Sequence, residues 1–248
     1  IRGTYADRSG KVTLMEDGVL IAPAPYASSS AYYFPTAGRI AGVEVLKGPA
    51  AISQGPYTIG GAINLLSTPI ADESGGIINQ ELGQDGTSRT HLHYSAVDTQ
   101  VALLVESHTW ETDGFDSIKG SNADTGFDKD DIVVKLRINS DPSLDGVYHE
   151  LNIKYQESDE SSDQTYVGLA DADFRKDAYS RYGLSAYDNM DNSHETTSFN
   201  YVGDFGNLEL SATIYDNDFA RNWFKVDKID NKKVYGHGNG INNIIAAA

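Results

Sequence analysis

The sequence predicts a mainly β fold in two parts: a small α+β module over residues 1–70 and antiparallel strands over residues 71–248. In the first part, glycine and proline break the apolar runs into short pieces, which favours short strands and tight turns. In the second part, segments of about ten residues alternate apolar and polar side chains, the pattern of half-buried or membrane-spanning strands. Long acidic connections separate several of these segments.

Turn residues place the elements of the module. Asp17-Gly18 lies between two short apolar runs, which predicts a β-hairpin. Residues 43–46 predict a strand that Gly48-Pro49 ends, and the proline suits the first turn of a short helix over residues 50–54. A second strand is predicted over residues 62–67. The module is therefore expected to be a compact α+β unit.

The second part has a period of two residues. In residues 130–141 one face is apolar and the other mostly charged: Ile132, Val134, Leu136 and Ile138 against Val133, Lys135 and Arg137. The alternation recurs over residues 147–156 and 207–216. A transmembrane β-barrel produces this pattern, and so does a soluble antiparallel sheet with one solvated face. Alternation alone leaves both folds open.

The connections between the predicted strands favour the barrel. Some are short, such as Asp98-Thr99, and others are long and polar, such as residues 113–131 and 158–195. Alternating short and long connections are expected where one rim faces the periplasm and the other the outside. A compact soluble domain rarely contains loops of that length. We therefore expect transmembrane barrel strands with acidic loops at the outer rim.

Composition excludes several classes of function. The net charge of -17 argues against a nucleic-acid partner, because phosphate backbones require lysine and arginine. The chain has no cysteine, which excludes disulfides, thiolate zinc sites and cysteine nucleophiles. No apolar run approaches the roughly 18 residues of a membrane-spanning helix. Both ends are abrupt, so we expect an internal piece of a longer chain.

No motif predicts catalysis. Ser53 lies in a sequence similar to a nucleophile elbow, but Gly48-Pro49 ends the preceding strand too early for that turn. His91 and His93 share one face of a predicted strand, where they fit either a metal site or a polar lumen, and no third ligand is identifiable. We therefore predict no catalytic residue, no metal site, no cofactor and no enzymatic activity.

The opening part of the chain resembles a known family. The segment VEVLKGP (residues 43–49), the turn to Gly55 and the segment IGGAIN (residues 59–64) resemble the signature of the plug domain of TonB-dependent outer-membrane receptors. Ile1-Arg2-Gly3 and residues 15–19 are similar to earlier plug strands. Three later segments resemble the barrel of the ferric-dicitrate-receptor-like branch: TYVGLADADF, RYGLSAYDNMDN and NDFARNWFKV.

The resemblance implies a fold and an activity. Family members hold an N-terminal plug inside a barrel of about 22 strands, and they import scarce ligands, most often ferric siderophores. The energy comes from the TonB–ExbB–ExbD complex, which pulls on a TonB box that these residues do not contain. Residues 1–70 would be the C-terminal part of the plug, and residues 71–248 about seven barrel strands of an incomplete barrel. The location would be the lipid of the outer membrane of a Gram-negative bacterium.

The resemblance also implies site residues. Ligand contacts would come from two apical plug loops, the first with Ser29, Ser30, Tyr32 and Tyr33, the second with Tyr57 and Thr58. Three charged residues would hold the plug to the barrel: Arg39, Glu44 and Lys47. A ferric siderophore or ferric citrate is the expected cargo. The alternatives are another cargo (a different metal chelate, a cobalamin-like cofactor or a glycan) and a soluble secreted β-rich binding module or hydrolase.

Overall fold

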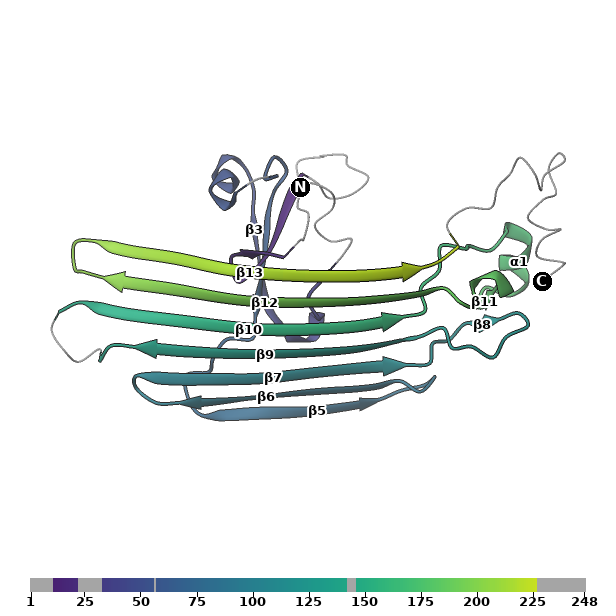
Figure 1. Ribbon diagram of the computed structural model, residues 1–248, viewed down its shortest axis with the longest axis horizontal. Helices are drawn as coiled ribbons and strands as arrows, with labels where there is room; N and C mark the ends of the chain where they lie inside the picture. Colours follow the sequence, from purple (N-terminus) through teal and green to yellow (C-terminus); the bar gives the residue numbers. More distant parts are fainter. Residues whose placement is uncertain (1–10, 22–32, 56, 142–145, 227–248) are drawn as a thin grey trace.

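The computed structural model describes residues 11–21, 33–55, 57–141 and 146–226. Its strands form a small four-stranded sheet, a long seven-stranded sheet and a two-stranded sheet. The small sheet crosses the middle of the long strands (Figure 1). It ends at Ser67 and the long sheet begins at Gly75, on either side of the expected boundary between the two parts.

The small sheet and its two 3-10 helices are called the module below. Its elements are β1 (Val12–Glu16), β2 (Val19–Leu20), η1 (Ala37–Arg39), β3 (Ile40–Leu46), η2 (Pro49–Gln54) and β4 (Gly61–Ser67). The sheet order is β2-β1-β4-β3, with β1 and β4 parallel. The predicted hairpin joins β1 to β2, and both turn residues have positive φ, 49° at Asp17 and 79° at Gly18.

The long sheet confirms the antiparallel strands that the alternation predicts. It consists of β5 (Gly75–Leu82), β6 (Ser88–Val97), β7 (Val101–Thr112), β9 (Phe127–Asn139), β10 (Tyr148–Ser162), β12 (Asn189–Asp204) and β13 (Glu209–Phe224). Each strand pairs with its neighbours in chain order, and within the described residues β5 and β13 remain as unpaired edges. The sheet is therefore an incomplete barrel, because a closed barrel has no edges.

The two faces of the long sheet differ in chemistry. The face that contacts the module, called the inner face below, buries Val133 completely, whereas Ile132 on the opposite face is 46% exposed. Apolar residues continue across this outer face from strand to strand in register: Leu103, Leu136, Ile153, Phe199 and Ile214. Alternate residues point to opposite faces, so the predicted apolar stripe faces away from the module.

The long connections gather at one end of the strands, on the right in Figure 1. There β8 (Ser117–Ile118) pairs in parallel with β11 (Ser180–Arg181), beside α1 (Asp171–Lys176) and η3 (Gly183–Ser185). The long acidic connections expected at this end therefore contain short elements of their own. Arg181 explains their order, because it donates hydrogen bonds to Asp116 and to the carbonyls of Asp163 and Thr125. Among the described residues, no helix is long and apolar enough to cross a membrane.

Candidate functional site

The most concentrated chemistry lies between the module and the inner face, around Arg39. This residue ends η1, immediately before β3, and its side chain is fully buried. Its terminal nitrogens donate to both carboxylate oxygens of Glu16, one of them at 3.2 Å. Its Nε donates to Oδ2 of Asp131 on β9 at 3.0 Å. The planar guanidinium therefore joins the module to the long sheet through two carboxylates.

Two lysines on the inner face extend this network. Lys154 Nζ on β10 lies 2.5 Å from Glu16 and 2.8 Å from Asp17. Lys135 Nζ on β9 lies 3.4 Å from Asp17 and donates to the carbonyl of Thr68 at 2.8 Å. The three module residues of the network carry one positive and two negative charges, and its three sheet residues carry the reverse. The two surfaces are therefore electrostatically complementary.

Glu16, Asp17 and Arg39 stay charged at neutral pH. Burial alone would raise the pKa of Glu16, but the charges of Arg39 and Lys154 outweigh it and hold the pKa below its usual value. Burial opposes ionisation of Asp17 as well, yet Lys154 and Lys135 lower the pKa of that carboxyl. Burial would also lower the pKa of Arg39, but Glu16, the Tyr33 oxygen and Asp131 keep it well above the ordinary value.

Tyr33 lies in the same interface. It is only 3% exposed, and its hydroxyl accepts hydrogen bonds from Arg39 at 3.1 Å and from Gln156 of β10 at 2.5 Å. Its ring stacks on His194 of β12 with 3.8 Å between the centroids. Burial raises the pKa of Tyr33 well above its usual value, so it remains a neutral phenol. Its role as a ligand contact stays a prediction.

The other expected ligand contacts occupy different surroundings. Ser29, Ser30 and Tyr32 lie outside the described residues. Tyr57 is exposed in the turn after η2, with a left-handed φ of 63°, and the Thr58 hydroxyl donates to the carbonyl of Gly55 at 3.1 Å. These two residues share one exposed turn, whereas the Tyr33 hydroxyl is bonded to Arg39 and Gln156. Their ligand roles stay predictions.

The three charged residues expected between plug and barrel differ in the contacts that their side chains make. Arg39 makes the contact with Asp131 described above. Glu44 accepts a hydrogen bond from Asn64 at 2.9 Å, within the small sheet. In the part of the chain that the structure describes, Lys47 makes no hydrogen bond or ion pair. Roles for Glu44 and Lys47 between plug and barrel stay predictions.

Sequence reasoning missed most of the network. It did not single out Glu16, Asp17, Asp131, Lys135 or Lys154 as site residues. One signal was available, because Lys135 lies on the polar face of a strand whose other face is apolar. A lysine at such a position needs either water or a carboxylate partner. The sequence does not say which, because the partner lies more than 100 residues away along the chain.

The histidine pair lies on the inner face beside this network. His91 Nε2 is 2.7 Å from Oε1 of Glu106 on β7, and the same oxygen accepts from the Thr68 hydroxyl at 2.8 Å. His93 lies 5.5 Å from His91 between ring centroids. Across the described residues, no three histidine, aspartate or glutamate side chains are arranged to hold a metal ion. His91 contributes to the contact with the module through Glu106, which Thr68 also contacts.

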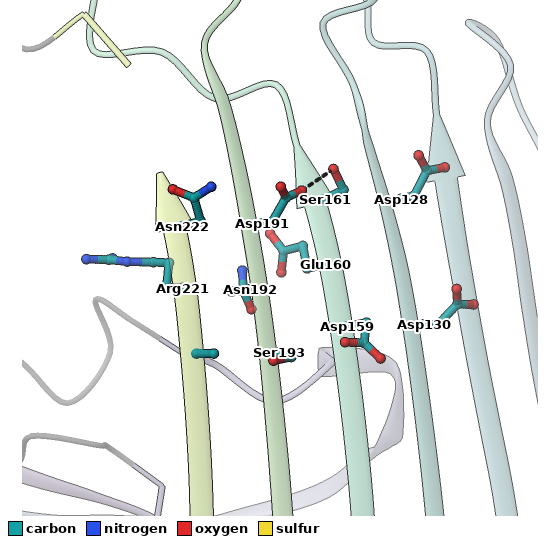
Figure 2. Close-up of a pocket in the computed structure, with 11 residues that line it drawn as sticks. Asp128, Asp130, Asp159, Glu160, Ser161, Asp191, Asn192, Ser193, Arg221 and Asn222 are labelled. Atoms are coloured by element: carbon teal, nitrogen blue, oxygen red, sulfur yellow. Dashed lines mark hydrogen bonds between the residues drawn. The ribbon is translucent and has the colours of Figure 1, made fainter. Parts of the chain in front are cut away.

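A hollow of about 550 Å³ lies near the loop end of β9, β10, β12 and β13. Figure 2 shows several carboxylates around it, including Asp130 and Asp159, whereas the Arg221 side chain extends away from them. Asp130 shares the outer face with Ile132, so these carboxylates point away from the module. Ser161 donates to Asp191 at 2.7 Å. The exposed carboxylates of Asp130 and Asp159 fit a solvated surface.

Comparisons with known proteins support a likeness of fold. No protein-family model and no curated protein matches the chain. It is similar to the unliganded ferric citrate transporter FecA: TM-score 0.68, 18% identity, 90% of this chain and 33% of that chain. The ferric yersiniabactin uptake receptor FyuA from Yersinia pestis gives TM-score 0.63, 20% identity and coverage of 86% and 33%.

The siderophore receptor PiuA from Acinetobacter baumannii gives TM-score 0.62, 15% identity and coverage of 87% and 30%. The chain thus spans about a third of the length of the solved structures it matches. Identities this low establish architecture alone. The resemblance seen in the plug-like motifs is confirmed at that level: the chain has the fold of part of the solved siderophore receptors and of the ferric citrate transporter.

Proposed function

We propose that the chain is part of a TonB-dependent outer-membrane receptor that imports an iron chelate of the ferric siderophore or ferric citrate type. The observation that carries the proposal is the module seated on the inner face of an incomplete barrel through Arg39, Glu16 and Asp131. The module would be the plug. The apolar outer face would contact the lipid of the outer membrane, because it has no protein partner among the described residues.

The chemistry of this interface suits a plug that must loosen. A buried ion pair gains Coulomb energy but loses the hydration of both charges, so its net contribution to stability is small. Water that enters between Lys154 and Glu16 would solvate both groups and replace their contact. An apolar interface of the same size would resist wetting. Force from the TonB–ExbB–ExbD complex would therefore separate charged surfaces that water then stabilises.

The cargo would bind the apical plug loops through hydroxyl-bearing residues. Tyr57 and Thr58 are described in the structure, and Ser29, Ser30 and Tyr32 would join them, together with Tyr33, which the interface buries. A non-glycine residue with left-handed φ is costly, and such residues concentrate at functional sites. The backbone of Tyr57 meets that description and supports a binding role for its turn.

Ligand titration of the full-length receptor tests the proposal. Ferric citrate and ferric siderophores of catecholate and hydroxamate type would be titrated while intrinsic fluorescence is followed. The pair of changes Tyr57→Ala and Thr58→Val should weaken binding about tenfold, the loss expected for one or two hydrogen bonds. Tyr94→Ala is the matched control, because Tyr94 is exposed on β6 and pairs in register with Val105 on the outer face. If the receptor binds none of these ferric chelates, the proposal of an iron cargo is wrong.

A further inference from the structure

A second site lies on the inner face beside the charged network. It extends toward the end of the sheet where short turns join the strands, away from the long connections (left in Figure 1). An open cavity of about 340 Å³ is lined there by β9, β10, β12 and β13 on one side and by the module on the other. The module contributes Asp17, Val19 and Ile70. A volume of this size accommodates a small ligand.

Arg137 is the unusual member of the cavity lining. Its Nε is buried and has no hydrogen-bond partner, and within the described residues no carboxylate forms an ion pair with it. The other two cations of the lining are paired: Lys135 with Asp17, and Lys154 with Asp17 and Glu16. The guanidinium of Arg137 is therefore the uncompensated charge of this cavity.

Glu150 is the carboxylate of the lining that could have neutralised Arg137. Its two oxygens are already engaged, because Oε1 accepts from Asn152 at 2.8 Å and Oε2 accepts from the Tyr148 hydroxyl at 2.6 Å. Asn152 is directly opposite Arg137 in the strand register, which places this amide between the two charges. The buried Nε of Arg137 is a donor without an acceptor, which is unfavourable, so the site is suited to an external anion.

The neighbouring strands supply further donors. Asn152 pairs in register with Asn200 of β12, and Asn200 pairs with Thr213 of β13, so these side chains share the face of Arg137. Thr213 Oγ1 accepts a hydrogen bond from Asn200 at 2.8 Å, which leaves its own hydroxyl proton available for donation. A forked guanidinium and a nearby hydroxyl match the several acceptor oxygens of a carboxylate or phosphate.

We propose that this cavity binds a small oxyanion, a carboxylate or a phosphate, with Arg137 as its anchor. The site is separate from the apical loops and does not depend on the identity of the cargo. Occupation has a consequence for the module, because Lys135 and Lys154 line the same cavity. A bound anion competes with Asp17 for these two lysines and so weakens the hold of the inner face on the module.

Anion titration of the full-length protein tests this site in the absence of ferric chelate. Inorganic phosphate and citrate would be titrated by calorimetry at pH 7 and low ionic strength, and the tighter of the two identifies the class of anion. Arg137→Gln should weaken binding about tenfold or more, since a hydrogen bond to a charged group is lost. Arg175→Gln is the matched control and should leave binding unchanged, because Arg175 is exposed on α1.

Two results would overturn the site: no saturable binding of either anion, or equal affinity in the protein with and without Arg137→Gln. Thr213→Val provides a milder test if Arg137→Gln impairs folding, and it should weaken binding several-fold. Hydrogen exchange supplies a second readout, because saturating anion should accelerate exchange of β1 amides in the unaltered protein and not in the Arg137→Gln variant. Chelate binding at the apical loops is measured separately, so failure of this site leaves the receptor proposal intact.

Discussion

Arg39 and Asp131 are 92 residues apart in the sequence, yet Nε of the arginine lies 3.0 Å from the carboxylate and both side chains are fully inaccessible to solvent. The aspartate also accepts a hydrogen bond from the Thr36 hydroxyl at 2.9 Å. Its second oxygen, Oδ1, has no hydrogen-bond partner. One contact thus fixes the segment around η1 against β9, and the predictions below test how much it holds.

Replacing Asp131 by asparagine should loosen the module selectively. Arg39 would keep its ion pair with Glu16 but lose the negative charge of Asp131. Removing one partner of a buried ion pair lowers stability by about 3 kcal/mol or more. Hydrogen exchange in the full-length protein should accelerate in β1 and β4. Asp130→Asn is the matched control, because Asp130 is exposed on the other face of the same strand. Equal exchange in both variants would contradict a supporting role for Asp131.

Acid should weaken the contact between the module and the long sheet. The carboxyls of Glu16 and Asp17 have pKa values lowered by folding, so their contribution is complete above the ordinary values of 4.5 and 3.8 and is lost as the pH falls below them. Thermal unfolding measured between pH 3 and pH 7 would show this loss of stability. Lys154→Met should reduce the dependence of stability on pH. The control Lys176→Met, on exposed α1, should leave the dependence of stability on pH unchanged. Parallel curves for all three proteins would argue against this linkage.

Gly38 allows η1 to approach the inner face. A Cβ atom at this position would lie 2.5 Å from Nε2 of His108 and 2.7 Å from Nη2 of Arg89. Gly38→Ala should therefore destabilise the seated module by about 1–3 kcal/mol through overpacking, and His108→Ala in the same protein should restore part of the loss. Gly75→Ala is the control, since a Cβ there meets no atom within 4 Å. The measurement is exchange of β1 and β4 amides, and an unchanged Gly38→Ala protein would exclude the close approach.

Arg181 should control the order of the long connections. Its three hydrogen bonds to Asp116, Asp163 and Thr125 measure 2.8, 2.6 and 3.2 Å and join three separate segments. Arg181→Met leaves three partly buried acceptors without their donor, so trypsin should cleave faster after Lys119. Arg175→Met should have little effect, because its ion pair with Asp171 is exposed. If trypsin cleaves the two variants at similar rates, Arg181 does not order the long connections.

Local features of the fold could be predicted because their physical causes are local. The Asp17-Gly18 turn defines its own hairpin, since both residues adopt positive φ. The alternation over residues 130–141 identifies a strand with an apolar face, because successive side chains point to opposite sides. The order within the long connections could not be predicted in this way. Their acidic composition suggested solvated loops, whereas a partly buried arginine, Arg181, orders them through contacts that composition does not encode.

The sequence by itself therefore determined several strands and their apolar face, because periodicity and turn chemistry act over a few residues. Its motifs supplied the resemblance to a receptor family. Only the tertiary structure decided which charges meet. Alternation shows that Asp131, Val133 and Lys135 share a face, but not that Arg39 and Asp17 lie opposite it. It also does not show that Nε of Arg137, on the same face, is buried without a hydrogen-bond partner among the described residues. Long-range electrostatic pairing depends on how the module is oriented against the sheet, and that orientation is a property of the packed molecule.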